Sequence, residues 1–133
     1  MQTVLLIEDS KLQRMTSEHL FKKAGYRVLI AVDGEEGLRI ARETRPDVIL
    51  LDMMLPKLGG QELLHSLKSD PTTSRIPVVV LTGLSQKNEE RLLAGGAAAF
   101  IEKSYALDNP QLFLQRIKRV LDGSPIETRV PHA

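Results

Sequence analysis

The sequence contains no cysteine, which excludes disulfide bonds and thiolate metal sites. Only three histidines occur, at His19, His65 and His132, and they are too scattered to suggest a zinc cluster. The net charge is only +1, from 18 basic and 17 acidic residues, so we expect no broad attraction to nucleic acid or membranes. No apolar run approaches the roughly 20 residues that a membrane span requires.

The composition is that of one globular domain. The chain has 133 residues, of which 42% are hydrophobic and 26% charged, enough for one compact domain and too few for two ordinary ones. Residues 1–3 lead directly into an apolar run, so no signal peptide is visible and we expect a cytoplasmic location. We assign residues 1–122 to the domain. Residues 123–133 carry two prolines and little periodicity, which predicts a flexible tail.

Five short apolar runs divide the chain. Apart from Arg27, which opens the second run, each is continuously apolar, as in strands that are buried on both faces of a parallel sheet. The runs lie at residues 4–7, 27–31, 48–51, 78–81 and 99–101. The stretches between them are long enough for helices. One such stretch shows the i, i+3, i+4, i+7 apolar spacing of a helix, at Gly60, Leu63, Leu64 and Leu67.

Cap residues support the same division. Ser10 can cap a first helix over about 11–24, and Gly25 can end it in a left-handed conformation. Asn109 and Pro110 are typical of the start of a last helix. The alternation predicts an α/β fold, with a doubly wound, five-stranded parallel sheet of strand order 2-1-3-4-5 in a flavodoxin-like three-layer sandwich.

Acidic residues follow two strands that this order places side by side. Glu8 and Asp9 follow the first strand, and Asp52 follows the third. The carboxyl ends of these strands form the crevice where such folds bind ligands. Crowded carboxylates repel one another, and Mg²⁺ would relieve the repulsion because it prefers oxygen ligands and also binds phosphate. Each acid alone is equally well explained as a solvated loop residue, but together they predict a Mg²⁺ site.

Two further polar groups are predicted at the same edge of the sheet. Thr82 follows the fourth strand and Lys103 follows the fifth. Either residue alone is more often an ordinary strand-end or surface residue. An anionic phosphoryl group, however, requires hydrogen-bond donors and positive charge around it, and lysine supplies a point charge for phosphate.

With these motifs in order, the sequence resembles the response-regulator receiver domain of two-component signalling, the CheY-like family. The resemblance covers about residues 3–121. It is carried by four motifs, which are Glu8-Asp9, the run from Asp52 to Gly60, Thr82-Gly83 and the run from Phe100 to Lys103.

The resemblance implies a phosphorylation switch and a role for each motif residue. Asp52 would accept a phosphoryl group as the nucleophile. Mg²⁺ would be bound by the carboxylates of Asp9 and Asp52 and by the backbone carbonyl of Met54, with Glu8 assisting directly or through water. Lys103 would pair first with Asp52 and then with the phosphoryl oxygens. Thr82 would donate to a phosphoryl oxygen, and Phe100 would change rotamer as Thr82 moves. The protein would catalyse only its own phosphoryl transfer and autodephosphorylation.

Two departures from the family pattern concern this machinery. The family usually has a proline after the lysine, often with a cis peptide bond, and here Ser104 follows Lys103. A cis bond before a residue other than proline costs roughly 2.5–4 kcal/mol, so the bond is either trans with a shifted loop or cis under strain. The switch aromatic is Phe100 rather than tyrosine, and a plain core role for it remains open.

The resemblance also implies the partners. The phosphoryl donor would be a sensor histidine kinase or a phosphotransfer protein, and the output would be an unidentified protein. The expected contact face consists of the helix ending at Gly95-Gly96, the strand at 99–101 and the last helix, and dimerisation through this face is compatible with the resemblance. No DNA-binding module or basic stripe follows residue 121, so we expect no direct contact with nucleic acid. The balanced charge and the lack of a long apolar run predict no membrane contact.

Three alternative functions fit the sequence less well. A receiver-like interaction module that is not phosphorylated is favoured only by Ser104. A flavodoxin would bind a phosphate at its first βα loop, where Glu8 and Asp9 would repel it. A phosphatase with an aspartate nucleophile would carry a second acid two residues after Asp52, where Met54 stands instead.

Overall fold

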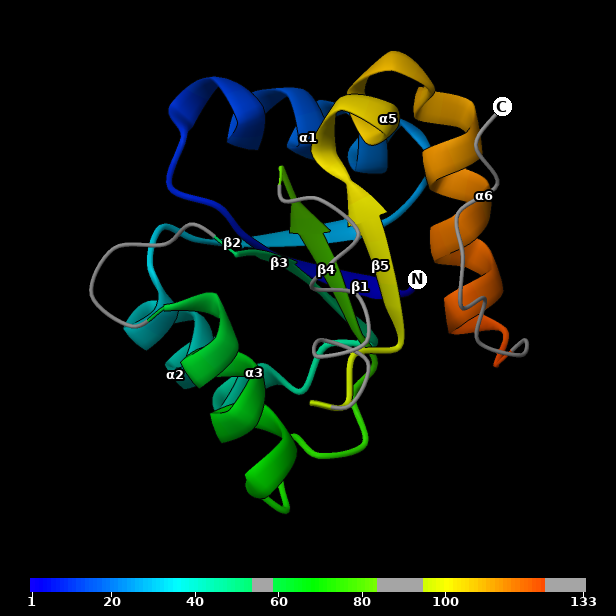
Figure 1. The fold of residues 1–133 in the computed structure, drawn as a ribbon. Helices are drawn as coiled ribbons and strands as arrows, with labels where there is room; N and C mark the ends of the chain where they lie inside the picture. The colour runs from blue at the N-terminus through cyan, green and yellow to red at the C-terminus, as the bar shows by residue number, and fades with distance from the viewer. Residues whose placement is uncertain (54–58, 84–94, 124–133) are drawn as a thin grey trace.

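The computed structural model describes residues 1–53, 59–83 and 95–123, and these form one parallel sheet with helices on both faces (Figure 1). The strands are β1 (Thr3–Ile7), β2 (Arg27–Ala31), β3 (Val48–Asp52), β4 (Val78–Thr82) and β5 (Ala99–Glu102). The helices are α1 (Lys11–Lys23), α2 (Gly34–Thr44), α3 (Gly60–Ser69), α5 (Lys103–Asp108) and α6 (Pro110–Leu121).

The strand order is β2-β1-β3-β4-β5, and all four pairings are parallel. This confirms the predicted α/β fold, its strand order and its three layers. Residues 48–51 of β3 are fully buried, because this central strand is covered on both faces. The apolar run at 48–51 therefore marked a strand buried on both faces, whereas β2, at the edge of the sheet, starts with the exposed Arg27 and is only partly buried.

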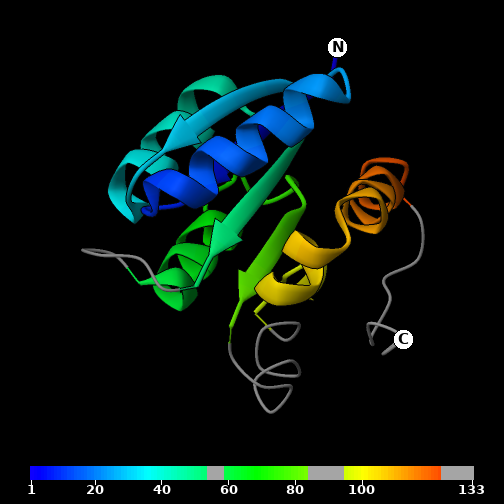
Figure 2. The ribbon, with the colours of Figure 1, turned by 90° about the horizontal axis from the view of Figure 1, so that it is seen from above.

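Two hydrophobic clusters fill the space between the sheet and its helices. One packs α2 and α3 against the sheet through Ala41, Leu63, Leu64 and Leu67. The other packs α1, α5 and α6 against the opposite face, through Phe21, Ala106, Phe113 and Ile117. Seen from above, α1 and α5 lie on the viewer's side of the sheet, and α6 lies beside it, viewed nearly along its axis (Figure 2). The rings of Phe21 and Phe113 meet edge to face at 5.4 Å and join α1 to α6.

The ends of the first helix follow the sequence prediction. The Ser10 side chain accepts a hydrogen bond from the Gln13 N–H, which caps α1. After α1, Gly25 has a φ of 98°, the left-handed backbone conformation that favours glycine, as predicted. Asn109 does occupy the N-cap position of α6, but its side-chain amide donates to the Tyr105 carbonyl instead of capping.

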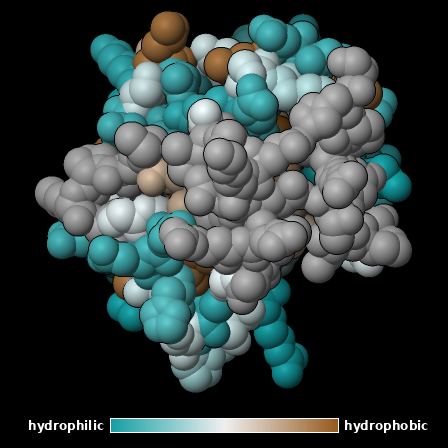
Figure 3. Space-filling view, viewed as in Figure 1, coloured by the Kyte–Doolittle hydropathy of each residue, from teal (hydrophilic) through white to brown (hydrophobic). Residues whose placement is uncertain are grey.

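Helix α5 was missed by the sequence analysis. It has six residues, which is too short for an apolar period to be visible, and it begins immediately after β5. The predicted fourth helix and most of the predicted tail fall at residues 84–94 and 124–133, outside the described residues. On the face seen in Figure 3, hydrophobic residues appear in small separate groups among hydrophilic ones.

Candidate functional site

The carboxyl ends of β1 and β3 bring three acids together. Asp52 ends β3, and Glu8 and Asp9 follow β1. Each acid offers a carboxylate oxygen, and these oxygens all lie within 4.8 Å of one another. Asp52 is 2% exposed and Glu8 is 3% exposed, whereas Asp9 is exposed at the rim. The acids predicted to share one crevice therefore do so.

Lys103, which directly follows β5, also contacts this cluster. Its Nζ lies 2.9 Å from Asp52 Oδ2 and 3.3 Å from Glu8 Oε1, so one ammonium contacts both buried carboxylates. The peptide bond between Lys103 and Ser104 is trans, which decides the alternative left open by the sequence. Lys103 is the first residue of α5, and the Ser104 hydroxyl bonds to the Glu102 carboxylate just before the helix. A helix start thus stands where the family usually places a proline.

The charges of the cluster do not balance. Burial, followed by the neighbouring Asp52 carboxylate, raises the pKa of Glu8 to about 7, although the Ser10 N–H and Lys103 oppose the shift. Burial alone would lower the pKa of Lys103, but the hydrogen bonds and charges of Asp52 and Glu8 outweigh it and raise that pKa. Three carboxylates around one ammonium leave an excess of negative charge, which a cation would neutralise.

Two residues of α1 take part in the site and were missed by the sequence analysis. Gln13 Oε1 accepts a hydrogen bond from Lys103 Nζ at 2.8 Å. Arg14 Nη1 donates to the backbone carbonyls of Glu8, at 3.3 Å, and Asp9, at 2.9 Å, and so holds the loop between β1 and α1. Gln13 lies in the first turn of α1, just after the loop that carries Glu8 and Asp9, but no local pattern pointed to its contact with Lys103.

Gly60 positions the end of β3. A Cβ atom at Gly60 would lie 2.7 Å from Met53 Cα and 2.8 Å from Met53 Sδ, distances at which one group must move. Met53 directly follows Asp52 and is itself buried. The start of α3 can therefore approach the residue next to Asp52 only because residue 60 has no side chain.

Of the remaining predicted site residues, Thr82 and Phe100 lie in described strands, and Met54 lies outside the described residues. Thr82 ends β4, and its backbone is in register with Glu102 of β5. Its predicted hydroxyl contact, and the predicted Met54 carbonyl ligand, fall outside the described part of the chain. Phe100 is 5% exposed and packs in the cluster that contains α2 and α3, so it is a core residue, and its predicted rotamer change stays a prediction.

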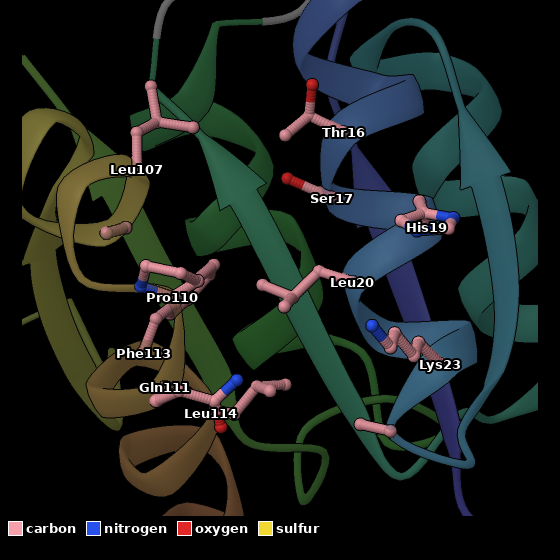
Figure 4. A pocket seen from close by; sticks show the side chains of 12 residues that line it. Thr16, Ser17, His19, Leu20, Lys23, Leu107, Pro110, Gln111, Phe113 and Leu114 are labelled. Carbon is pink, nitrogen blue, oxygen red and sulfur yellow. The ribbon is translucent and has the colours of Figure 1, made fainter.

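A separate groove of about 490 Å³ lies between α1, α5 and α6 (Figure 4). Leu20, Leu107 and Phe113 are among its apolar lining residues, and His19 and Lys23 line it from α1. Neither the three acids nor Lys103 lines this groove. It is distinct from the acidic cluster.

The donor set of the cluster suits a hard cation. Its carboxylate oxygens, two of them from buried residues, are the ligand type that Mg²⁺ prefers. The site can hold a small divalent cation beside a carboxylate that is paired with an ammonium.

No helix in the described ranges is both long and apolar enough to cross a membrane.

Comparison with known proteins identifies relatives of the chain. The sequence profile of the response regulator receiver domain matches residues 4–118. The polar-differentiation response regulator DivK of Brucella anthropi is 36% identical over 121 residues, which are 90% of this chain and 96% of DivK. The DivK protein of Brucella ovis is 35% identical over the same shares of both chains.

Solved structures show the same fold. The chemotaxis protein CheY4 of Vibrio cholerae superposes with a TM-score of 0.82 at 30% identity, covering 90% of this chain and 98% of that one. The receiver domain of a sensor histidine kinase from Pseudomonas aeruginosa gives a TM-score of 0.79 at 31% identity, covering 92% of this chain and 98% of that one. The latter structure is described with a magnesium ion coordinated in its active site cleft.

Proposed function

The chain belongs to the response-regulator receiver domain family, and we propose that it is a phosphorylation switch in which Asp52 is the phosphoacceptor. Receiver domains are signalling proteins rather than metabolic enzymes. The observation that carries the proposal is the contact of Lys103 Nζ with Asp52 Oδ2 at 2.9 Å, in a pocket that also holds Glu8 and Asp9. This arrangement supplies a nucleophile, a positive charge and a set of cation ligands.

In the proposed reaction, Asp52 is the nucleophile. One of its carboxylate oxygens forms a bond to the phosphorus of the donor while the bond from phosphorus to the leaving group breaks, and the leaving group keeps the electron pair. The product is an aspartyl phosphate. Because the backbone of Asp52 lies in the central strand of a buried sheet, its carboxylate is held in place for attack.

The proposed Mg²⁺ ligands are the carboxylates of Asp9 and Asp52 and the backbone carbonyl of Met54, with Glu8 assisting directly or through water. Bound Mg²⁺ would neutralise the carboxylates and the incoming phosphoryl oxygens. Asp9 is exposed at the rim and the other two acids are buried, so the cluster faces the opening through which a donor must arrive. A magnesium-containing receiver domain of the same fold supports this assignment.

Lys103 has two partners in succession in this proposal. Before transfer its ammonium pairs with the Asp52 and Glu8 carboxylates. After transfer it pairs with an oxygen of the phosphoryl group on Asp52, which carries the negative charge at that stage. Thr82 would donate to another phosphoryl oxygen, and Phe100 would repack as Thr82 moves. The signal is a shift between two conformations that the phosphoryl contacts favour unequally.

The partners in the proposal are a sensor histidine kinase or a phosphotransfer protein as the donor, and a protein of unknown identity as the output. The proposed output face includes β5 and α6, together with the predicted helix that ends at Gly95-Gly96. Dimerisation through this face and the division at residue 122 stay predictions. The cytoplasmic location also stays a prediction, as does the absence of direct nucleic-acid binding.

Phosphorylation with a small phosphodonor tests the proposal directly. The protein is incubated with Mg²⁺ and acetyl phosphate or phosphoramidate, and its intact mass is recorded. We expect one added phosphoryl group in the wild type and none in Asp52→Asn, which keeps the shape of the side chain but loses the nucleophile. An unchanged wild-type mass, or an equal gain in Asp52→Asn, would refute the role of Asp52.

The same experiment separates the alternative, an interaction module that is not phosphorylated. Ser104 was the one sequence feature that favoured this alternative. In the structure, Lys103 contacts Asp52 although the bond to Ser104 is trans and no proline follows. The missing proline therefore gives no support to the alternative.

A further inference from the structure

The Lys103 ammonium has a third partner besides the two acids. An ammonium carries three N–H donors and no acceptor. In the structure, Lys103 Nζ has three acceptors within hydrogen-bonding or ion-pair distance, which are Asp52 Oδ2 at 2.9 Å, Glu8 Oε1 at 3.3 Å and Gln13 Oε1 at 2.8 Å. Each donor therefore has a partner, and Gln13 is the only neutral one among these three.

Gln13 is itself well fixed. Its backbone N–H donates to the Ser10 side chain in the first turn of α1, so the helix cap that starts α1 also places the residue that contacts Lys103. Next to it, Arg14 holds the backbone of Glu8 and Asp9. The start of α1 thus fixes both the acids and the Gln13 amide relative to β1.

Lys103 has few constraints of its own. A lysine side chain has four rotatable carbon bonds and loses about 2 kcal/mol of rotamer entropy when it is held in one place. Its backbone begins the six-residue helix α5, and the bond to Ser104 is trans. The position of its ammonium therefore depends on the groups that bind it. With the two acids alone, all the attraction would come from the side of the pocket that must also receive a phosphoryl group.

We propose that Gln13 is a positioning residue that holds the Lys103 ammonium in place for phosphoryl transfer to Asp52. The inference rests on the proposed function and extends it to a residue outside the motifs that identify the family. During transfer, the Asp52 carboxylate gives up its charge and the ammonium must turn to a phosphoryl oxygen. Throughout the transfer, one N–H of the Lys103 ammonium stays hydrogen-bonded to Gln13 Oε1. Because the Gln13 amide is neutral, the positive charge of Lys103 remains available to the phosphoryl group.

Gln13→Met tests this role with little change of shape. Methionine has nearly the same length as glutamine but lacks a strong acceptor. The small cavity beside Gln13 and Lys103 has four apolar lining residues that can pack against the new side chain, which are Leu81, Ala106, Leu107 and Phe113. Gln111→Met is the matched control, because Gln111 is an exposed residue of α6 outside the acidic cluster.

The measured quantity is the rate constant for phosphorylation by acetyl phosphate at saturating Mg²⁺, followed by intact mass. We expect Gln13→Met to be slowed about fivefold, the effect of one ordinary hydrogen bond, and Gln111→Met to match the wild type. In a Lys103→Ala background, Gln13→Met should slow phosphorylation further by less than about twofold, because Gln13 acts through Lys103. A structural role for Gln13 would give the same slowing in both backgrounds.

The possible results are all informative. If Gln13→Met reacts at the wild-type rate, or is slowed equally in the Lys103→Ala background, the positioning role is wrong while the phosphorylation of Asp52 stands. If the wild type takes up no phosphoryl group, the proposed function fails and the inference fails with it. If Gln13→Met does not fold, Gln13→Asn replaces it, since this variant keeps the amide but is one methylene too short to reach Nζ, and the same slowing is expected.

Discussion

Replacing Gly60 by alanine tests whether a missing side chain on α3 sets the position of the phosphoacceptor strand. The added Cβ would lie 2.7 Å from Met53 Cα, 2.8 Å from its Sδ and 3.0 Å from its carbonyl oxygen. The Sδ atom ends a flexible side chain and can move at little cost, but Cα and the carbonyl belong to the backbone that follows Asp52. Either α3 or the end of β3 must therefore shift.

The expected magnitude follows from two opposing effects. Overpacking a closely packed site typically costs 1–3 kcal/mol. Alanine is favoured over glycine inside a helix by roughly 0.5–1 kcal/mol, and this gain is smaller at the first helical residue. We therefore expect Gly60→Ala to lower the free energy of unfolding by about 1–2 kcal/mol. It should also weaken Mg²⁺ binding, because the shifted backbone joins Asp52 to Met54.

The neighbouring glycine provides a matched control. A Cβ at Gly59 would meet nothing within 4 Å, and the φ of −64° there suits alanine. Alanine is less favoured than glycine at an N-cap, but Gly→Ala at a compatible φ stabilises by about 0.4–1 kcal/mol through the unfolded chain. Because these effects oppose each other, we expect Gly59→Ala to change the unfolding free energy by no more than about 0.5 kcal/mol. Urea denaturation of both variants, with and without Mg²⁺, measures the two effects. Equal stability of the two variants would show that the close approach of α3 to Met53 does not constrain the site.

Three further predictions concern charge. In Mg²⁺-free buffer, the wild type should lose stability relative to Glu8→Gln as the pH rises from 4.5 through about 7. The reason is that the pKa of Glu8 is higher in the folded than in the unfolded chain, so the fold loses free energy as Glu8 ionises. The loss should be on the order of 3 kcal/mol and be largely reversed by millimolar Mg²⁺ at pH 8, and parallel urea-unfolding curves for the two proteins would contradict it. Lys103→Ala should fold normally but respond weakly to phosphorylation, and a full change in its NMR spectrum on phosphorylation would exclude the role given to Lys103. Hydrogen bonds from the Thr72 hydroxyl and N–H, and then Arg42, lower the pKa of Asp70 to about 2, so the wild type should lose stability relative to Asp70→Asn as the pH falls from 3.8 through that value. Thermal melts of both proteins across this range check the last prediction, and a constant difference between them would count against it.

Much of the fold was readable from local patterns. The five strands were located to within one residue at each end, because each is a short, mostly apolar run, as is typical of strands in a covered parallel sheet. The cap at Ser10 and the left-handed Gly25 were also predicted, since both depend on the chemistry of a single residue at a helix end. Helix α5 was not predicted, because six residues show no helical period and its position depends on packing against the sheet.

The acidic cluster was predicted because the strand order alone brings Glu8, Asp9 and Asp52 to one edge of the sheet. The trans bond at Lys103 was not predictable, since the sequence allowed both isomers and only the packed chain selects one. Gln13 was also missed, although it lies in the first turn of α1, close along the chain to Asp9. Its partner Lys103 is 90 positions away, and no local pattern indicates such a contact.

By itself, the sequence determined the strands, their order and the chemistry available at one edge of the sheet, because burial and strand-end position leave marks in the residues themselves. Only the tertiary structure decided which oxygens surround the Lys103 ammonium and how far burial raises the pKa of Glu8. Those properties depend on distances between side chains from different strands and helices, and such distances exist only after the chain has packed.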